Sequence, residues 1–341
     1  MIYKQKRNRV FRSYFGGKRL DEFFGIENPK DTQFPEEWIA STAVAFNAGR
    51  ENIVEGPSVL EDGTLLTDLI NSNPEKTLGK NQVEKYGNNM SILVKLLDAA
   101  ERLFIQCHPT AEFSKKYFNS QFGKTECWYI ISAEPDACVY IGFKPEITKE
   151  KWIECFNNDD TAGLLNLMHR ISVKPGDLIF VAGGVPHAIG GGCLLCELQE
   201  PTDYMVIPER KSKSGITLTD KKMHGGLGFD RMFDCFVYEG FTEQEIRNKF
   251  VKHLEFKADT IKNLVGTDLT DKFSMDLLCV EAEIEMPNDG KYSVAIILEG
   301  KAELTFGDEK IIVSKGDELF IDASTPDIHW QGCAKAFICK P

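Results

Sequence analysis

The sequence has no apolar run of the roughly 20 residues that a membrane-spanning helix requires, and it has no excess of basic residues. It contains 40 Lys and Arg against 52 Asp and Glu, which gives a net charge of −12. A chain this acidic is poorly suited to bind nucleic acid through its overall charge, and it repels anions at long range. Neither a membrane nor a nucleic acid is therefore expected as a partner, and any phosphate site requires a local group of cations.

No export signal is expected either, because the basic segment MIYKQKRNRVF is not followed by an apolar stretch. We therefore expect a cytoplasmic protein in which the ten cysteines stay reduced. Cys193 and Cys196 form a CxxC, but on a strand these positions face opposite sides, and the sequence holds no second CxxC. The pair is predicted to pack in the core.

The order of predicted elements indicates a mainly β protein with helical insertions. The 341 residues suffice for about two domains. Short segments rich in β-branched residues, bounded by Gly, Pro or Asp, dominate the second half and predict strands. Helices are predicted at LLTDLINSN, PEKTLGKNQVEKYG, TAEFSKKYFNS, TKEKWIECFNN and DTAGLLNLMHRI, the last ending before Val173.

One internal repeat divides the chain. Residues 173–182 read VKPGDLIFVA and residues 313–322 read VSKGDELFID, so Val, Gly, Asp and Phe coincide. Two unrelated hairpins can share such a turn by chance, but the Gly-Asp turn between strands in both copies favours two related β-barrels. We place the boundary between them near residue 235.

Three separated elements carry side chains that bind metals in proteins. Gln106 and His108 lie two apart in LFIQCHP, and alternate side chains of a strand share a face, with Cα atoms roughly 6–7 Å apart. Glu126 opens the apolar strand ECWYII, where an interior carboxylate is costly unless it is paired or bound to a metal. A strand then runs into a Gly-Gly-Val-Pro turn and returns with His187. Taken singly, each element also fits a structural role at a strand end or rim.

Together these elements resemble one family. The spacing of Gly176, Gly184 and His187 resembles the second cupin motif, with Ala182 in place of a proline. The whole set resembles the type I phosphomannose isomerase family, through LVKLLDAAERLFIQCHP, GKTECWYI, VKPGDLIFVAGGVPHAIGGG and ELQEPTDY, which follow in the family's order and spacing. The resemblance covers most of residues 8–205, and the remainder fits the family's second, metal-free domain.

The resemblance implies a fold and a function. The fold is mainly β, with two cupin (jelly-roll β-barrel) domains: a metal-binding catalytic domain at 1–235 and a metal-free domain at 236–341. The activity is that of a zinc-dependent isomerase that interconverts mannose 6-phosphate and fructose 6-phosphate. A mixed nitrogen and oxygen ligand set is typical of catalytic zinc, although it also suits iron, manganese or cobalt. The implied ligands of one zinc per chain are Gln106, His108, Glu126 and His187.

The second copy of the repeat lacks such a set. Asp327 stands at the position matching His187, and no Gln-x-His pair accompanies it. His329, two residues on, shares a face with Asp327 and is predicted to be structural.

The residues that would act on the substrate are less sharply marked. The reaction moves a proton between C1 and C2, which requires a base, and the phosphate and developing oxyanion require donors. The candidates for catalysis are Arg210, Lys124 and Glu197, and those for substrate binding are Ser41, Lys95, Lys124 and Lys213. A rim salt bridge is the alternative role for Glu197, and a solvated loop is the alternative for Arg210, Lys211 and Lys213.

One position departs from the family. An arginine usually follows the Ser/Thr-Asp element by four residues, but here Thr202-Asp203 leads to Ile207. Arg210, three residues further on, is predicted to replace it. The departure leaves a second hypothesis open, a non-catalytic sugar-phosphate-binding protein that keeps its metal. A third, an iron oxygenase, is disfavoured because the usual facial triad has two His and one carboxylate without Gln.

Overall fold

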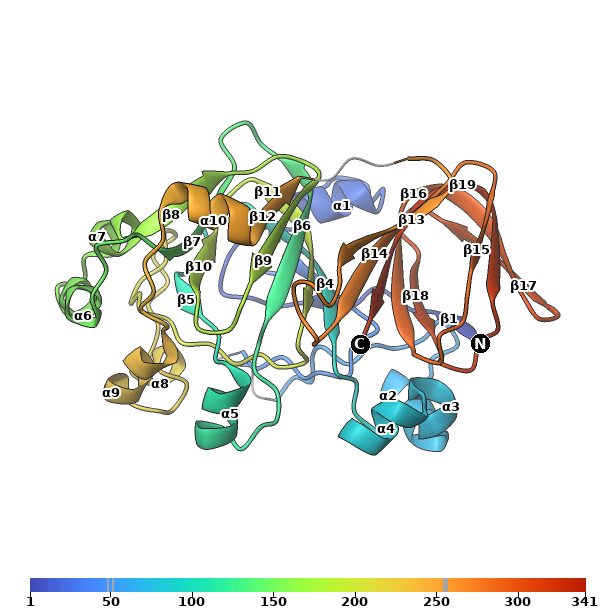
Figure 1. Ribbon diagram of the computed structural model, residues 1–341, viewed down its shortest axis with the longest axis horizontal. Coiled ribbons are helices and arrows are strands. Elements are labelled where there is room, and N and C mark those ends of the chain that lie inside the picture. Colours follow the sequence, from blue (N-terminus) through green and yellow to red (C-terminus); the bar gives the residue numbers. More distant parts are fainter. Residues whose placement is uncertain (48, 51, 254–256) are drawn as a thin grey trace.

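Two β-barrels lie side by side in the computed structural model (Figure 1), which describes residues 1–47, 49–50, 52–253 and 257–341. Both barrels consist of antiparallel strands. In the view of Figure 1, the helices α6 (Lys149–Asn157) and α7 (Thr161–Asn166) lie at the left end of the pair, and most of the other helices lie along its lower edge. No helix in the described ranges is long and apolar enough to cross a membrane.

The first barrel is built from two sheets. The seven-stranded sheet has the spatial order β12 (Val251–His253), β9 (Asp177–Val181), β6 (Glu126–Ala133), β11 (Cys193–Gln199), β4 (Leu93–Ala99), β3 (Glu36–Ile39) and β2 (Arg9–Val10). The four-stranded sheet has the order β5 (Gln106–Cys107), β10 (Pro186–Ile189), β7 (Cys138–Phe143) and β8 (Met168–Ser172).

The second barrel is one eight-stranded sheet. Its main order is β1 (Ile2–Lys4), β18 (Glu318–Ile321), β16 (Ser293–Phe306), β19 (Ile328–Lys340), β14 (Ser274–Val280) and β13 (Thr260–Val265). In addition, β15 (Glu283–Met286) pairs with β19, and β17 (Glu309–Ser314) pairs with β16. Because β1 pairs with β18, the N-terminal strand belongs to the barrel that also holds the C-terminus.

Several helices begin with a side-chain cap. Thr148 and Thr242 accept hydrogen bonds from backbone N–H groups of the first turns of α6 (Lys149–Asn157) and α10 (Glu243–Phe250), and Thr242 forms a capping box with Glu245. The helices are α1 (Lys18–Phe23), α2 (Leu66–Ser72), α3 (Pro74–Leu78), α4 (Lys80–Tyr86), α5 (Ala111–Tyr117), α6 (Lys149–Asn157), α7 (Thr161–Asn166), α8 (Asp220–Met223), α9 (Phe229–Met232), the 3₁₀ helix η1 (Phe233–Cys235) and α10 (Glu243–Phe250).

Each helix expected from the sequence is present, but one prediction extended too far. The segment DTAGLLNLMHRI was expected to stay helical up to Val173, whereas α7 ends at Asn166 and Met168–Ser172 forms β8. Met168, His169 and Ile171 are buried, because β8 pairs with β7 along its length. Sheet pairing here outweighs the helix propensity of the Leu- and Met-containing segment.

The two barrels share a core. One apolar cluster contains Cys196 from β11 and Cys339 from β19, and the ring centroids of Tyr129 and Phe337 lie 4.8 Å apart across the contact. Cys193 packs in a different cluster, inside the first barrel, so the two members of the CxxC face opposite sides as predicted. All ten cysteines are free thiols.

Strand pairing favours a later division than the one predicted at residue 235. Helix α10 and strand β12 follow that point, and β12 pairs with β9 of the first barrel from Val251 to His253. The next described strand, β13, pairs with β14 of the second barrel. We therefore propose that the first domain extends to residue 253.

Candidate metal centre

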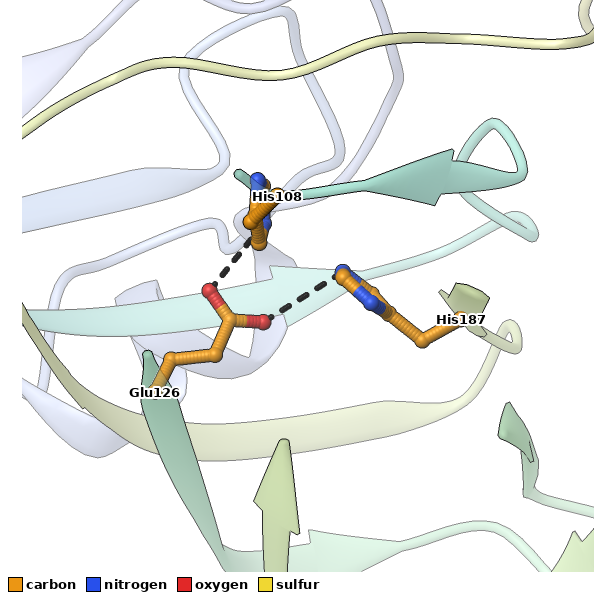
Figure 2. A group of neighbouring side chains, drawn as sticks. All are labelled: His108, Glu126 and His187. Carbon is orange, nitrogen blue, oxygen red and sulfur yellow. Dashed lines mark ion pairs between the residues drawn. The ribbon is translucent and has the colours of Figure 1, made fainter. Parts of the chain in front are cut away.

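Three buried side chains converge inside the first barrel. Their possible ligand atoms, on His108, Glu126 and His187, all lie within 4.8 Å of one another. Figure 2 shows the two imidazoles on either side of the carboxylate. His108 follows β5 directly, Glu126 is the first residue of β6, and His187 lies on β10. Strand register brings the elements together, because His187 pairs with Gln106 of β5.

The glycine turn before His187 is what allows this approach. The N–H of Gly184, whose φ is 86°, donates to the carbonyl of His108 at 2.7 Å. A Cβ atom at Gly183 would lie only 2.8 Å from the carbonyl oxygen of Pro109. A side chain at Gly183 would therefore push the turn away from the segment that follows His108, and one at Gly184 would be strained by the positive φ and would meet Val237.

Backbone contacts fix both imidazoles in the tautomer that leaves Nε2 free to accept. Nδ1 of His108 lies 2.8 Å from the carbonyl oxygen of Tyr204, and Nδ1 of His187 lies 2.9 Å from that of Val185. A carbonyl only accepts, so each Nδ1 carries the proton and each Nε2 keeps its lone pair. Such an outer hydrogen bond is the usual arrangement around metal-binding histidines.

Lys124 is the cation next to this group. Its Nζ lies 2.8 Å from Oε2 of Glu126 and 2.6 Å from Nε2 of His108. Burial and the nearby ammonium lower the pKa of His108 to about 4, and burial also lowers the pKa of His187. Burial alone would raise the pKa of Glu126, but Lys124 and the histidines hold it well below the usual range. Two neutral imidazoles and one carboxylate are the protonation states that metal binding requires.

Two acceptor atoms of the group face each other without a donor. Oε1 of Glu126 and Nε2 of His187 are buried, lack any hydrogen-bond partner among the described residues, and lie 3.4 Å apart. Unpaired buried acceptors are rare and costly. A divalent cation between them would satisfy both, so the residues present fit a metal with nitrogen and oxygen ligands.

A cavity of about 360 Å³ lies beside this group. Its size is within the usual range for small-molecule sites. Gln106, the other predicted ligand, lines it, as does Ile207. The cavity wall also carries four cations and three carboxylates, in contrast to the acidic chain as a whole: Arg12, Lys95, Lys124, Lys222, Glu36, Glu197 and Asp203.

Buried ion pairs hold most of these charges in place. Nζ of Lys95 lies 3.0 Å from Glu197 and 3.9 Å from Glu36. Nε of Arg12 lies 2.9 Å from Glu36, and its two terminal nitrogens lie 3.3 and 3.4 Å from the two oxygens of Asp203. Burial would raise the pKa of Asp203, but Arg12 and Lys95 lower it far below its usual value.

Three of the site residues predicted from the sequence, Arg210, Lys213 and Ser41, do not line this cavity. Arg210 and Lys213, with Lys211 between them, line a neighbouring cavity, and the guanidinium of Arg210 pairs with Asp159 at 2.7 Å. Ser41 is buried and lies outside the wall of the first cavity; its hydroxyl accepts from the N–H of Ala43. Lys95, Lys124 and Glu197 do line that cavity.

Four charged residues of the cavity wall were not predicted from the sequence as site residues: Arg12, Glu36, Asp203 and Lys222. Glu36 lies in the segment PEEWIAS, on the same buried strand as Trp38 and Ile39. A carboxylate in such an apolar strand was the one indication in the sequence that this residue has a special role. Arg12 and Lys222 lie outside regular strands, where no periodic pattern indicates which way a side chain points.

Comparison with known proteins agrees with this geometry. Residues 7–147 match the catalytic domain of type I phosphomannose isomerase, and residues 265–340 match the cupin domain of mannose-6-phosphate isomerase. A putative mannose-6-phosphate isomerase of Bacillus subtilis, YvyI, is 28% identical over 93% of this chain and 92% of its own. The mannose-6-phosphate isomerase of Streptococcus mutans is 27% identical over 96% and 94%.

The chain belongs to the type I phosphomannose isomerase family. The crystal structure of the mannose 6-phosphate isomerase from Bacillus subtilis superposes with a TM-score of 0.74 at 25% identity, covering 99% of each chain. A zinc-bound mannose 6-phosphate isomerase has the same fold, with a TM-score of 0.76 at 16% identity and 99% coverage of each chain. The predicted family, the mainly β cupin fold and the assignment as an isomerase are thereby confirmed.

Proposed function

We propose that this family member is a zinc-dependent aldose–ketose isomerase that interconverts mannose 6-phosphate and fructose 6-phosphate. The observation that carries the proposal is the buried group of His108, Glu126 and His187, with two unpaired acceptors, at the wall of a cavity rich in cations. Relatives named as mannose-6-phosphate isomerases support the substrate, and the zinc-bound relative supports the metal.

We propose that one zinc is held by His108, Glu126, His187 and Gln106. Two observations support Gln106 as the fourth ligand: it lines the cavity, and it is paired in register with His187, so both side chains extend from the same face of the sheet. When bound, zinc supplies a Lewis acid that stabilises negative charge developing on substrate oxygens.

Lys124 and Glu197 are the side chains best placed to act beside the metal ligands. Lys124 contacts both His108 and Glu126 and reaches the cavity wall, where its ammonium can donate to a substrate oxygen. Glu197 accepts from Nζ of Lys95 at 3.0 Å and from Nε1 of Trp128 at 3.2 Å, so its carboxylate is fixed in orientation. A carboxylate held this way suits the base that carries the proton between C1 and C2.

The alternative is a sugar-phosphate-binding protein without catalysis. The observation in its favour is Ile207, which is apolar, buried and part of the cavity wall where the family usually has an arginine. Membership of an isomerase family favours the enzyme.

The test is turnover by purified, zinc-loaded protein. Formation of fructose 6-phosphate from mannose 6-phosphate is expected, with loss of activity on chelation and recovery on zinc addition. In deuterium oxide, solvent deuterium is expected to enter the substrate at C2, and Glu197→Gln should abolish this exchange while zinc content stays unchanged. Absence of turnover with zinc, iron, manganese or cobalt would overturn the isomerase proposal.

A further inference from the structure

We infer that Lys222 binds the phosphoryl group of the substrate in this chain, which resolves how the cavity functions with Ile207 in place of an arginine. The inference rests on the proposed function, because it assigns one end of the same cavity to the sugar phosphate. It adds a binding residue from helix α8, a segment outside the metal-binding strands.

Among the cations of the cavity wall, Lys222 alone has no partner in the described part of the chain. Arg12, Lys95 and Lys124 are each held by buried carboxylates. The ammonium of Lys222 makes no hydrogen bond or ion pair with any residue that the structure describes, although its side chain lines the same cavity. A phosphate carries a charge of about −1.5 to −2 near neutral pH, so the incoming group requires a cation that is not already neutralised.

Backbone hydrogen bonds hold Lys222 close to the usual arginine position. The N–H of Ile207 donates to the carbonyl of Met223 at 2.8 Å, so the backbone at the usual arginine position is tied to the residue next to Lys222. The preceding residue, Val206, exchanges two backbone hydrogen bonds of 2.9 Å with Cys107 of β5. These two backbone contacts connect the residue next to Lys222 to β5, the strand that carries Gln106.

The backbone at Lys222 is held by the first turn of α8. Thr219 caps α8 by accepting from the N–H of Lys222, and the N–H of Met223 donates to the carbonyl of Thr219. This fixes the backbone at Lys222, while its four-carbon side chain stays adjustable. Lys221, its neighbour, is exposed and does not line the cavity. One lysine of the pair thus faces the cavity and the other serves as a matched control.

Asp203 lines the same cavity as Lys222. Its carboxylate is held by Arg12 at 3.3 and 3.4 Å, and the nearby charge of Lys222 contributes to its lowered pKa. Arg12 donates two hydrogen bonds to Asp203 and forms an ion pair with Glu36 at 2.9 Å, so two carboxylates already balance its charge. Arg12 is therefore a positioning residue that fixes Asp203, whereas Lys222 remains available to the ligand.

The test is direct binding, measured by calorimetry on zinc-loaded protein with mannose 6-phosphate and, separately, with mannose. Lys222→Ala and Lys222→Gln are expected to weaken binding of mannose 6-phosphate about 10- to 100-fold, as expected for loss of a charge-assisted contact. Lys222→Arg should recover most of the affinity. Lys221→Ala should match the parent, and binding of mannose should be unchanged in every variant.

Steady-state kinetics give the second measurement. Lys222→Ala should raise KM by a similar factor and weaken inhibition by inorganic phosphate, with zinc content and thermal stability unchanged. Affinity within twofold of the parent in both Lys222→Ala and Lys222→Gln would overturn the inference, as would failure of the parent to distinguish mannose 6-phosphate from mannose. If the parent binds mannose 6-phosphate through Lys222 but does not turn it over, the proposed isomerase function fails and the inference stands.

Discussion

The two barrels repeat the same hairpin around different interiors. In the first barrel, the turn at Gly176 has a φ of 90°, and Asp177 accepts from the N–H of Lys174 at 2.9 Å. In the second, Gly316 has a φ of 89°, and Asp317 accepts from the N–H of Ser314 at 2.8 Å. The repeat seen in the sequence is therefore a repeat of turn geometry.

Inside the barrels the resemblance stops. The first barrel encloses His108, Glu126 and His187, whereas the interior of the second is filled by an apolar cluster that includes Trp330 and Leu304. His329 lies at the surface of the second barrel, with its Nδ1 3.3 Å from Glu285. The shared backbone thus does not specify a metal site; a few inward polar side chains do.

The largest expected difference between the barrels concerns turnover. Glu126→Gln removes the carboxylate between the two imidazoles, and we expect kcat to fall at least about a thousandfold, equivalent to about 4 kcal/mol. Glu285→Gln, beside His329 in the second barrel, should leave kcat unchanged within about twofold. Both are measured at saturating mannose 6-phosphate, with bound metal determined alongside. Near-normal turnover in Glu126→Gln would mean that the chemistry lies elsewhere.

The next largest difference concerns ion pairs. Lys95 and Glu197 in the first barrel are 3% and 5% exposed, so Lys95→Met leaves a buried carboxylate without its main partner and should cost about 3–5 kcal/mol. Lys335 and Glu299 in the second barrel are 45% and 64% exposed, and Lys335→Met should cost about 0.5 kcal/mol or less. Urea denaturation of both variants measures the contrast, and equal losses would refute it.

Acidic side chains between the barrels should make stability depend on pH. Glu37 of β3 is buried near Glu318 of β18, and burial raises the pKa of Glu37 to about 7 despite the hydrogen bond from Asn8 and the nearby Arg7 and Arg9. From about pH 4.5 to 7 the unfolded chain is ionised at Glu37 while the folded chain keeps the proton, so stability falls as pH rises, by up to about 3 kcal/mol.

Substitution of Glu37 tests this dependence. Glu37→Gln should flatten the pH profile between about pH 4.5 and 7 and raise stability above it, because no buried carboxylate remains to ionise. The measurement is the free energy of unfolding across that range. An unchanged slope would show that other groups set the pH dependence.

The smallest expected effect belongs to Arg210. Its sequence position predicted a catalytic role, but its guanidinium packs 4.2 Å over the ring of Phe156 and pairs with Asp159, along the neighbouring cavity. We now expect Arg210→Ala to change kcat by less than about threefold, since a partly exposed ion pair contributes little. A fall of two decades in steady-state turnover would return Arg210 to the active site.

The sequence predicted the functional side chains inside the first barrel better than those in the loops and short helices around it. The family resemblance grouped His108, Glu126 and His187, and the structure brings them together because paired strands hold their register where one face is buried. The positions of Arg210, in a loop, and Lys222, in the short helix α8, were not predictable in this way. Their directions depend on tertiary contacts, such as the hydrogen bond from Ile207 to Met223, that leave no periodic trace in the chain.

The measurement that tests the central comparison most directly is the metal content of purified protein after loading with excess zinc and removal of the free ion. The account predicts one zinc per chain in the parent and in His329→Ala, and almost none in His108→Ala or His187→Ala. Two zinc ions per chain in the parent, or full retention of zinc in both the His108 and His187 variants, would contradict it.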